Sequence, residues 1–263
     1  MGLRWAGVNT LYQALDHPLL KPKFTLIAQG GEDLPPNSLA FFEKMQKLSP
    51  KILVKADVMM TKDAHLVLFR ENNLKNLTNG TGFVHSSTLE ELKKLEYKTK
   101  PELNLEKQNI LTLEEYFQLF PHNKTLLNIA EQDPARIFNL KKIIETYDQK
   151  ENLIFMSDYP EPLKFLRRES PRSLFSLPTT EYVQINVLSS LFLEPLARMK
   201  ADLAVAPLKT KNNRTLLSER VVDEFKRRQI KLIVINNDSI PEWLKSKMDG
   251  VLTTRPENYL SQL

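Results

Sequence analysis

Short apolar runs and amphipathic segments alternate along the whole chain. The runs are rich in Val, Ile, Leu and Phe and are too short for helices, which is typical of buried strands in a parallel sheet. They predict strands at residues 24–28, 52–58, 66–69, 125–129, 153–156, 173–177, 203–206, 232–236 and 250–253. The segments between them predict helices at residues 38–48, 134–147, 162–168, 188–199, 215–228 and 241–247. Strands that alternate with helices over this length predict an α/β fold, and their number suits a (β/α)8 TIM barrel.

Two further helices are expected where a threonine is followed three residues later by a glutamate. These capping boxes are Thr88 with Glu91 and Thr112 with Glu115. The threonine oxygen and the glutamate carboxylate each accept a hydrogen bond from a free N–H group of the first turn. The first of these helices lies within a segment, roughly residues 72–111, that we interpret as a small insertion into the barrel.

One connection is too short for the crossover that joins parallel strands. Only MMTKDAH separates Val58 from Leu66, which predicts an antiparallel hairpin with its turn near Asp63–Ala64. If the two strands pair symmetrically about this turn, Asp57 lies opposite Arg70. Since residues two apart share one face of a strand, Lys55 points to the same side as Asp57. The hairpin therefore predicts one cluster of Lys55, Asp57 and Arg70.

Composition and charge exclude several classes of function. The formal net charge is +5 and the sequence pI about 9.2, but 37 Lys and Arg residues are mixed with 32 Asp and Glu residues. No block of like charge points to nucleic acid, so we expect no nucleic-acid partner and only a weak preference for anions. The absence of cysteine excludes disulfides, thiolate catalysis and Cys-ligated zinc.

The first 22 residues precede the first strand, and we interpret them as a helical arm laid on a barrel of residues 23–263. Its apolar residues Trp5, Leu11 and Tyr12 are candidate contacts for a partner. The arm lacks the basic region and apolar core of a secretory leader, and no apolar run of the chain is long enough to span a membrane. We expect a cytoplasmic protein without a transmembrane segment.

Several sequence blocks, in a fixed order, carry a resemblance to a known family. They read IAQGG and PPNS, KADVMMTKDA, VLFRENNLKNLTNGTG, NIAEQ, VINND and DGVLTTRP. In this order the chain resembles the glycerophosphodiester phosphodiesterase family over about residues 26–256. In members of that family the corresponding blocks read IAHRGG and PENT, E-x-D-V-x-x-T-K-D-G, VVxHDxxLxRxTxGxG, N-I-E-I-K, W-T-x-N-D and D-G-V-I-T-D-x-P. The resemblance implies a PLC-like phosphodiesterase TIM barrel with one antiparallel hairpin strand.

The same resemblance implies a divalent metal held by carboxylates and two histidines that exchange protons with the leaving and attacking groups. The histidine positions align with Gln29 and Arg70, and neither side chain exchanges a proton near neutral pH. Two of the three metal-ligand positions align with Lys55 and Ala130, so only Asp57 keeps its carboxylate. We therefore expect a pseudoenzyme of this family, without a metal or another cofactor.

Two cations at the former site favour a ligand-binding role. Lys55 supplies charge in place of the metal, and Arg70 offers a planar fork suited to phosphate or carboxylate. The candidate ligand-binding residues are Gln29, Lys55, Asp57, Arg70 and Gln132. The competing interpretation is an internal ion cluster that only fills the barrel, with the neighbouring Glu71 pairing with Arg70.

Two other functions remain open from the sequence. The first is an interaction module that binds a protein partner through its surface. The second is an active phosphodiesterase whose metal and acid–base residues have been relocated, with Glu131 as a replacement carboxylate if a bulge shifts its strand. The candidate bases are His17, His65, His85 and His122.

Overall fold

The computed structural model describes residues 17–131, 134–170, 173–208, 216–236 and 240–263. Its sheet runs in the order β6-β5-β4-β2-β1-β9-β8-β7, and β3 pairs with β2 outside this path. The strands are β1 (Thr25–Ala28), β2 (Leu53–Met60), β3 (Leu66–Leu68), β4 (Thr125–Ile129), β5 (Leu153–Met156), β6 (Leu174–Phe175), β7 (Leu203–Pro207), β8 (Lys231–Asn236) and β9 (Gly250–Thr253). The β2–β3 pair is antiparallel, and the other pairs are parallel.

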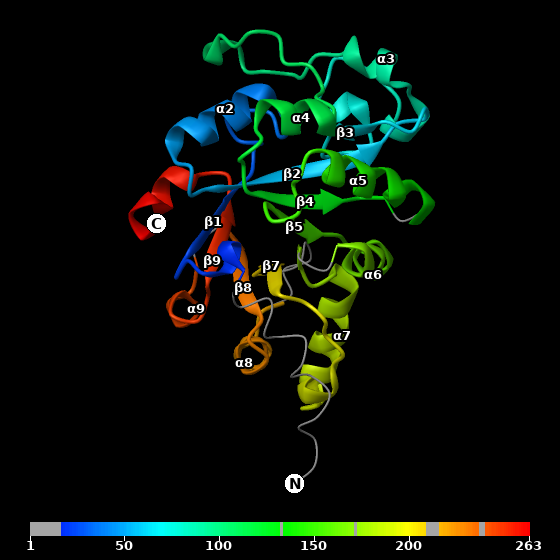
Figure 1. Cartoon of the computed structure of the whole chain (residues 1–263). Coiled ribbons are helices and arrows are strands. Elements are labelled where there is room, and N and C mark those ends of the chain that lie inside the picture. The colour runs from blue at the N-terminus through cyan, green and yellow to red at the C-terminus, as the bar shows by residue number, and fades with distance from the viewer. Residues whose placement is uncertain (1–16, 132–133, 171–172, 209–215, 237–239) are drawn as a thin grey trace.

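The sheet closes into a barrel through a parallel bridge between Ser176, next to β6, and Leu203 at the start of β7. The predicted barrel of eight parallel strands with one antiparallel hairpin strand is thus confirmed. Helices surround the strands (Figure 1). They are α2 (Leu39–Leu48), α3 (Leu89–Lys93), α4 (Leu113–Leu119), α5 (Pro134–Thr146), α6 (Pro160–Glu169), α7 (Thr179–Ser190), α8 (Glu219–Arg227) and α9 (Glu242–Lys245). The 3-10 turns are η1 (Pro18–Leu20), η2 (Leu74–Asn76), η3 (Val84–Ser86), η4 (Pro101–Leu103), η5 (Glu194–Leu196) and η6 (Pro256–Gln262).

Aliphatic side chains fill the barrel interior. The interior cluster consists of Ile27, Leu53, Leu126, Ile154, Leu174, Leu203, Val205, Ile233 and Leu252, together with Leu19 and Leu20 of η1. Because η1 precedes β1, its two leucines close the base of the barrel, where the strands begin. The described part of the predicted arm thus packs on the barrel, and its residues 1–16 lie outside the described residues.

The segment between β3 and α4 lies at one end of the molecule, beyond the barrel (Figure 1). It packs around a small core that it shares with β3, formed by Val67, Phe69, Leu74, Val84, Leu92, Tyr97 and Ile110. Both predicted capping boxes are present, at Thr88 with Glu91 and at Thr112 with Glu115. The predicted insertion thus packs on the hairpin side of the barrel, around a core that includes a residue of β3.

Two predictions from the sequence need correction. The hairpin register pairs Val58 with Leu68, so Phe69 lies opposite Asp57 and Arg70 lies one residue further along. The cause is a three-residue turn closed by the bond from the N–H of Thr61 to the oxygen of His65.

The helix expected at residues 188–199 is instead α7, which begins at Thr179 after Pro178. It ends at Ser190 because Phe192 adopts a left-handed backbone with φ 63°. None of the described helices is both long and apolar enough to cross a membrane.

Candidate functional site

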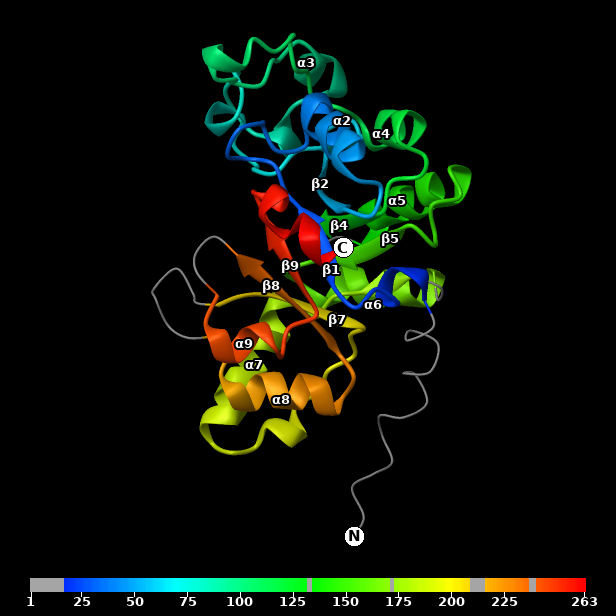
Figure 2. The same cartoon turned by 90° about the vertical axis from the view of Figure 1, so that its left-hand side faces the viewer.

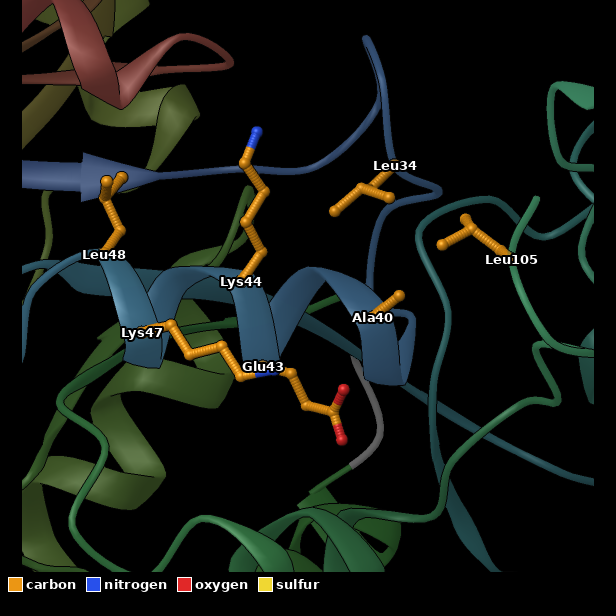
Figure 3. Close-up of a pocket in the computed structure, with 7 residues that line it drawn as sticks. All are labelled: Leu34, Ala40, Glu43, Lys44, Lys47, Leu48 and Leu105. Carbon is orange, nitrogen blue, oxygen red and sulfur yellow. The ribbon is translucent and has the colours of Figure 1, made fainter. Parts of the chain in front are cut away.

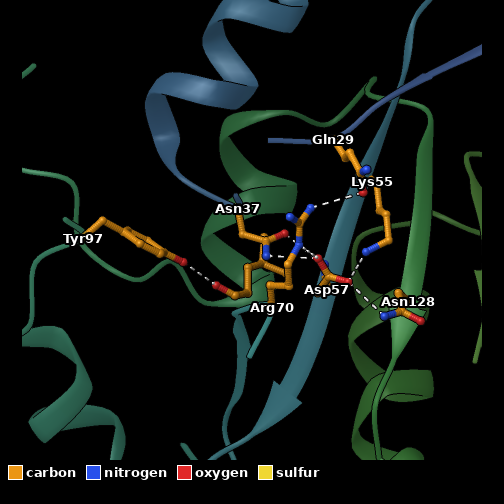
Figure 4. A network of polar contacts seen from close by, with 8 residues as sticks. Gln29, Asn37, Lys55, Asp57, Arg70, Tyr97 and Asn128 are labelled. Atoms are coloured by element: carbon orange, nitrogen blue, oxygen red, sulfur yellow. Dashed lines mark hydrogen bonds and ion pairs between the residues drawn. The ribbon is translucent and has the colours of Figure 1, made fainter. Parts of the chain in front are cut away.

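The polar side chains of the barrel gather at its mouth, where the parallel strands end. Ile27, Leu53 and Leu126 point into the interior, so the residues two positions further along each strand point the same way. These residues are Gln29, Lys55 and Asn128. Figure 4 shows them around Asp57, with Arg70 reaching in from the end of β3. In TIM barrels this end of the strands carries the functional groups.

The loop after β1 brings a further amide, Asn37, to the mouth. Gly30 allows this approach, because a Cβ at this position would lie 2.7 Å from the Cα of Pro36. Asn37 then adopts a left-handed backbone with φ 63°, which asparagine tolerates better than most residues. The next residue, Ser38, accepts a hydrogen bond from the N–H of Phe41 and begins α2.

Asp57 is the centre of the network and is 3% exposed. Its Oδ1 forms an ion pair with Lys55 and accepts a hydrogen bond from Asn128 Nδ2 at 2.9 Å. Its Oδ2 accepts from Asn37 Nδ2 at 3.3 Å and from Arg70 Nε at 3.5 Å. The backbone N–H of Asp57 donates to Asn37 Oδ1 at 2.9 Å. Each carboxylate oxygen therefore already serves two donors.

Electrostatics keep this carboxylate ionised. Burial opposes its charge, but the positive charges of Lys55 and Arg70, together with the hydrogen bonds from Lys55 and Asn128, outweigh burial, so the pKa of Asp57 is lowered from its usual value. Burial, together with the negative charge of Asp57, raises the pKa of Tyr97. The protonated Tyr97 hydroxyl donates to the backbone oxygen of Leu68 at 3.1 Å and fixes the end of β3 next to the site.

Arg70 is the charged member of the network most open to solvent, with its side chain 27% exposed, against 10% for Lys55. Its Nη2 donates to Gln29 Oε1 at 3.3 Å, which is a long hydrogen bond. The expected pairing with Glu71 is absent from the described contacts, where Glu71 accepts from Asn76. The guanidinium thus keeps donor capacity, and the network carries two cations against one anion.

Four of the five predicted ligand-binding residues meet at the mouth: Gln29, Lys55, Asp57 and Arg70. Gln132, the fifth, lies outside the described residues. Two members, Asn37 and Asn128, were missed by the sequence analysis. Asn128 lies next to Asp57 because the two residues are paired in the register of β2 with β4. The sequence of one strand does not reveal its register with another strand, so this neighbour could not be predicted.

The candidate bases of the alternative with relocated catalysis contact other residues. His65 pairs with Asp63 in the hairpin turn, at 3.3 Å from Nδ1 to Oδ2, and His85 Nδ1 lies 2.9 Å from Asn72 Oδ1. His17 accepts the N–H of Leu19 at the barrel base. His122 is exposed in the turn before β4. None of these three contacts brings a histidine to Asp57.

The described residues do not fit a divalent metal. Among them, no three His, Cys, Asp or Glu side chains lie close enough together to hold one. Asp57 is the carboxylate of the mouth network, and the Lys55 ammonium and the Arg70 guanidinium occupy its oxygens. A hard dication requires several oxygen ligands and would be repelled by both cations. The regular β2–β4 register through Ile129 gives no bulge that would turn Glu131 inward.

A separate hollow of about 520 Å³ lies outside the barrel, beside α2 (Figure 3). It is lined by Leu34, Ala40, Glu43, Lys44, Lys47, Leu48 and Leu105. None of these residues belongs to the network around Asp57. We therefore place the candidate site at the barrel mouth.

A TIM barrel with a polar, charged mouth is a scaffold for binding or transforming a small polar ligand. The chain belongs to the glycerophosphoryl diester phosphodiesterase family, whose model matches residues 30–258. The glycerophosphodiester phosphodiesterase of Caldanaerobacter subterraneus subsp. tengcongensis is 27% identical in an alignment of length 253, which covers 91% of this chain and 97% of that protein.

Solved structures share the fold. One is a phosphodiesterase from Oleispira antarctica, determined in complex with the product sn-glycerol-3-phosphate. It superposes with a TM-score of 0.71 at 18% sequence identity, and the match covers 90% of this chain and 96% of that chain. Another is a glycerophosphoryl diester phosphodiesterase from Parabacteroides distasonis, with a TM-score of 0.67 at 22% sequence identity. The match covers 97% of this chain and 92% of that chain. At these identities the likeness establishes the barrel and nothing about the chemistry of its mouth.

Proposed function

We propose that this family member binds an anionic group at the barrel mouth without a metal and does not hydrolyse glycerophosphodiesters. The observation that carries the proposal is the saturation of Asp57 by two cations and two amides. The resemblance implies a metal ion next to this carboxylate, and in this chain Lys55 supplies the positive charge at that place. Asp57 is held ionised and so has no proton to give to a leaving group, and the amide of Gln29 is not ionisable.

The ligand chemistry follows from the open side of Arg70. Its planar guanidinium suits a phosphate or carboxylate, and a bidentate contact would be shorter than its present bonds to Asp57 and Gln29. The Nε2 group of Gln29 donates to no described residue and is a second donor for the same anion. The excess positive charge of the network favours an anion over a neutral ligand.

Replacement of Arg70 tests this assignment. Titration calorimetry with inorganic phosphate and with glycerol 3-phosphate is expected to show saturable binding, reduced about tenfold or more in Arg70→Ala, because one charge-assisted contact is lost. Arg168→Ala is a matched control, since Arg168 is 73% exposed and lies on α6. An ion cluster that only fills the barrel predicts no saturable binding, and that result would reject the proposal.

Hydrolysis is the second candidate function, favoured by the match to the phosphodiesterase family over residues 30–258 and by the nearly full-length relative. Release of alcohol from glycerophosphocholine, measured with Mg²⁺, with Ca²⁺ and with chelator, separates the two. We expect no turnover in any condition. Metal-dependent turnover would show that ligands and bases have been relocated, and Glu131 and His65 would then be the first residues to replace.

A further inference from the structure

Large apolar side chains are exposed together at one corner of the barrel, which we call the apolar corner. It consists of Val183, Val187, Leu191, Phe192, Leu193 and Leu196, at the end of α7 and in the turn that follows. These six are a majority of the ten large apolar side chains exposed among the described residues. Phe192 is 76% exposed and Leu191 61% exposed. A cluster of this kind marks a contact surface, whereas single exposed residues do not.

The corner is built from two adjoining pieces of backbone. Val183, Val187 and Leu191 are spaced four residues apart and form a stripe along α7, while its opposite face buries Tyr182 and Ile185. The following turn carries the other three side chains outward. In both views the end of α7 lies at the lower edge of the described body, so the turn is a projecting feature (Figures 1 and 2).

Phe192 is held outward by specific contacts. Its φ of 63° is unusual for an aromatic residue, because Cβ crowds the backbone in the left-handed region. The guanidinium of Arg220 lies over the Phe192 ring, 3.8 Å from its centroid. The same guanidinium donates to both carboxylate oxygens of Glu194, at 2.8 and 2.9 Å. The exposed ring is therefore positioned by α8.

Two exposed cations follow the corner along the chain. Arg198 and Lys200 are exposed and form no ion pair with the described carboxylates. Arg228 donates to the backbone oxygen of Pro195 inside the turn. Two acidic residues that belong to the turn or contact it are already neutralised, since Glu194 pairs with Arg220 and Glu224 with Arg228. An apolar tip with unpaired cations next to it matches the chemistry of an anionic lipid surface.

We propose that the apolar corner docks on an anionic lipid bilayer, with Leu191 and Phe192 entering the interface and Arg198 and Lys200 contacting lipid phosphates. A second copy of the chain is a poorer occupant, because a two-fold contact would bring these cations against their own copies. Residues 1–16 are also a poorer occupant of the corner, because the opposite charges of Arg4 and Asp16 cancel and leave no excess of negative charge to attract the cations. The proposal does not depend on the function of the mouth.

Docking through this corner has a consequence for the mouth. The end of α7 leads to the start of β7, so it lies toward the base of the barrel. A protein bound to a bilayer there keeps its mouth open to the aqueous phase. The mouth would then receive a water-soluble anion and not a lipid still embedded in the bilayer.

Vesicle co-sedimentation of the full chain tests the proposal. We expect the wild type to sediment with phosphatidylcholine vesicles that contain phosphatidylglycerol, and much less with phosphatidylcholine alone or at high salt. The double variant Phe192→Ser, Leu196→Ser is expected to lose about tenfold or more in partition, since two apolar side chains no longer leave water. Arg198→Glu with Lys200→Glu should abolish the preference for the anionic lipid.

The control is Phe138→Ser with Leu119→Ser, which removes one phenylalanine and one leucine of similar exposure, 55% and 52%, outside the corner. It is expected to sediment like the wild type. Absence of wild-type binding to anionic vesicles, or equal losses in the two double variants, would overturn the proposal. A concentration-dependent dimer that Phe192→Ser, Leu196→Ser disrupts, without vesicle binding, would assign the corner to a second copy instead. Thermal unfolding of each variant confirms that it is folded.

Discussion

At Asp57 one carboxylate, only 3% exposed, contacts two cations and two amides. Its contribution to the free energy of unfolding differs from that of the exposed ion pairs of this protein, such as Lys100–Asp33 at 3.7 Å. Exposed pairs contribute about 0–1 kcal/mol because water and salt screen them. Removal of one partner of a buried pair costs about 3–5 kcal/mol because it leaves a buried charge unmatched.

Asp57→Asn is therefore expected to lower the free energy of unfolding by about 3–5 kcal/mol, since Lys55 and Arg70 lose their shared anion. Urea denaturation measures the change. Asp33→Asn, at a side chain 63% exposed, should cost less than about 1 kcal/mol. Equal small losses in both variants would mean that the mouth is hydrated enough to stabilise the cations without Asp57.

The pH dependence of stability has a definite sign at this residue. The pKa of Asp57 is lowered in the folded state from 3.8, so the folded protein binds fewer protons than the unfolded chain just below that pH. The stabilisation is fully present above about pH 5 and is lost as the pH falls through the folded pKa. Urea midpoints between about pH 5 and pH 2 should fall more steeply for the wild type than for Asp57→Asn. Parallel curves would contradict this assignment.

At the scale of the elements, the β2–β3 hairpin determines which residues meet. Its three-residue turn ends at Ala64, which adopts φ 65°. This left-handed conformation is unfavourable for a residue with a Cβ, although the turn requires it. The hairpin therefore carries local strain and still places Arg70 within 3.5 Å of Asp57.

Ala64→Gly is expected to raise the free energy of unfolding by about 0.5–1 kcal/mol, because glycine adopts the left-handed conformation without a steric penalty. Chemical denaturation measures the gain. Ala40→Gly, in the first turn of α2, should have the opposite sign and lose up to about 1 kcal/mol. A loss at both positions would show that Ala64 contributes packing that outweighs its backbone strain.

For the whole molecule, closure of the barrel depends on side chains from outside the strands. Leu19 of η1 is 2% exposed and belongs to the interior cluster with side chains from across the barrel. The segment before β1 thus contributes to the core, although it forms no strand.

Leu19→Ala is expected to destabilise the protein by about 2–5 kcal/mol, because it leaves a cavity at the barrel base. The measurement is urea denaturation, with Leu119→Ala as the control. That leucine is 52% exposed on α4, and its truncation should cost less than about 1 kcal/mol. If the two leucines cost the same, η1 would not be an integral part of the core.

The site could be predicted in large part, but not fully. Alternation along β2 places Lys55 beside Asp57, and the short connection to β3 brings Arg70, because both signals are local. Asn128 could not be assigned, since its approach to Asp57, 71 residues away in the sequence, depends on the register between β2 and β4. Helix α7 was misplaced because both of its faces carry apolar residues, which removes the period that identifies an amphipathic helix.

The sequence by itself determined the barrel and its hairpin strand, because periodicity, capping and motif order are properties of neighbouring residues. Only the tertiary structure decided that Asp57 is saturated by Lys55, Arg70 and two amides, and that Arg70 remains partly open. It also revealed the apolar corner, because exposure depends on which faces the rest of the chain covers.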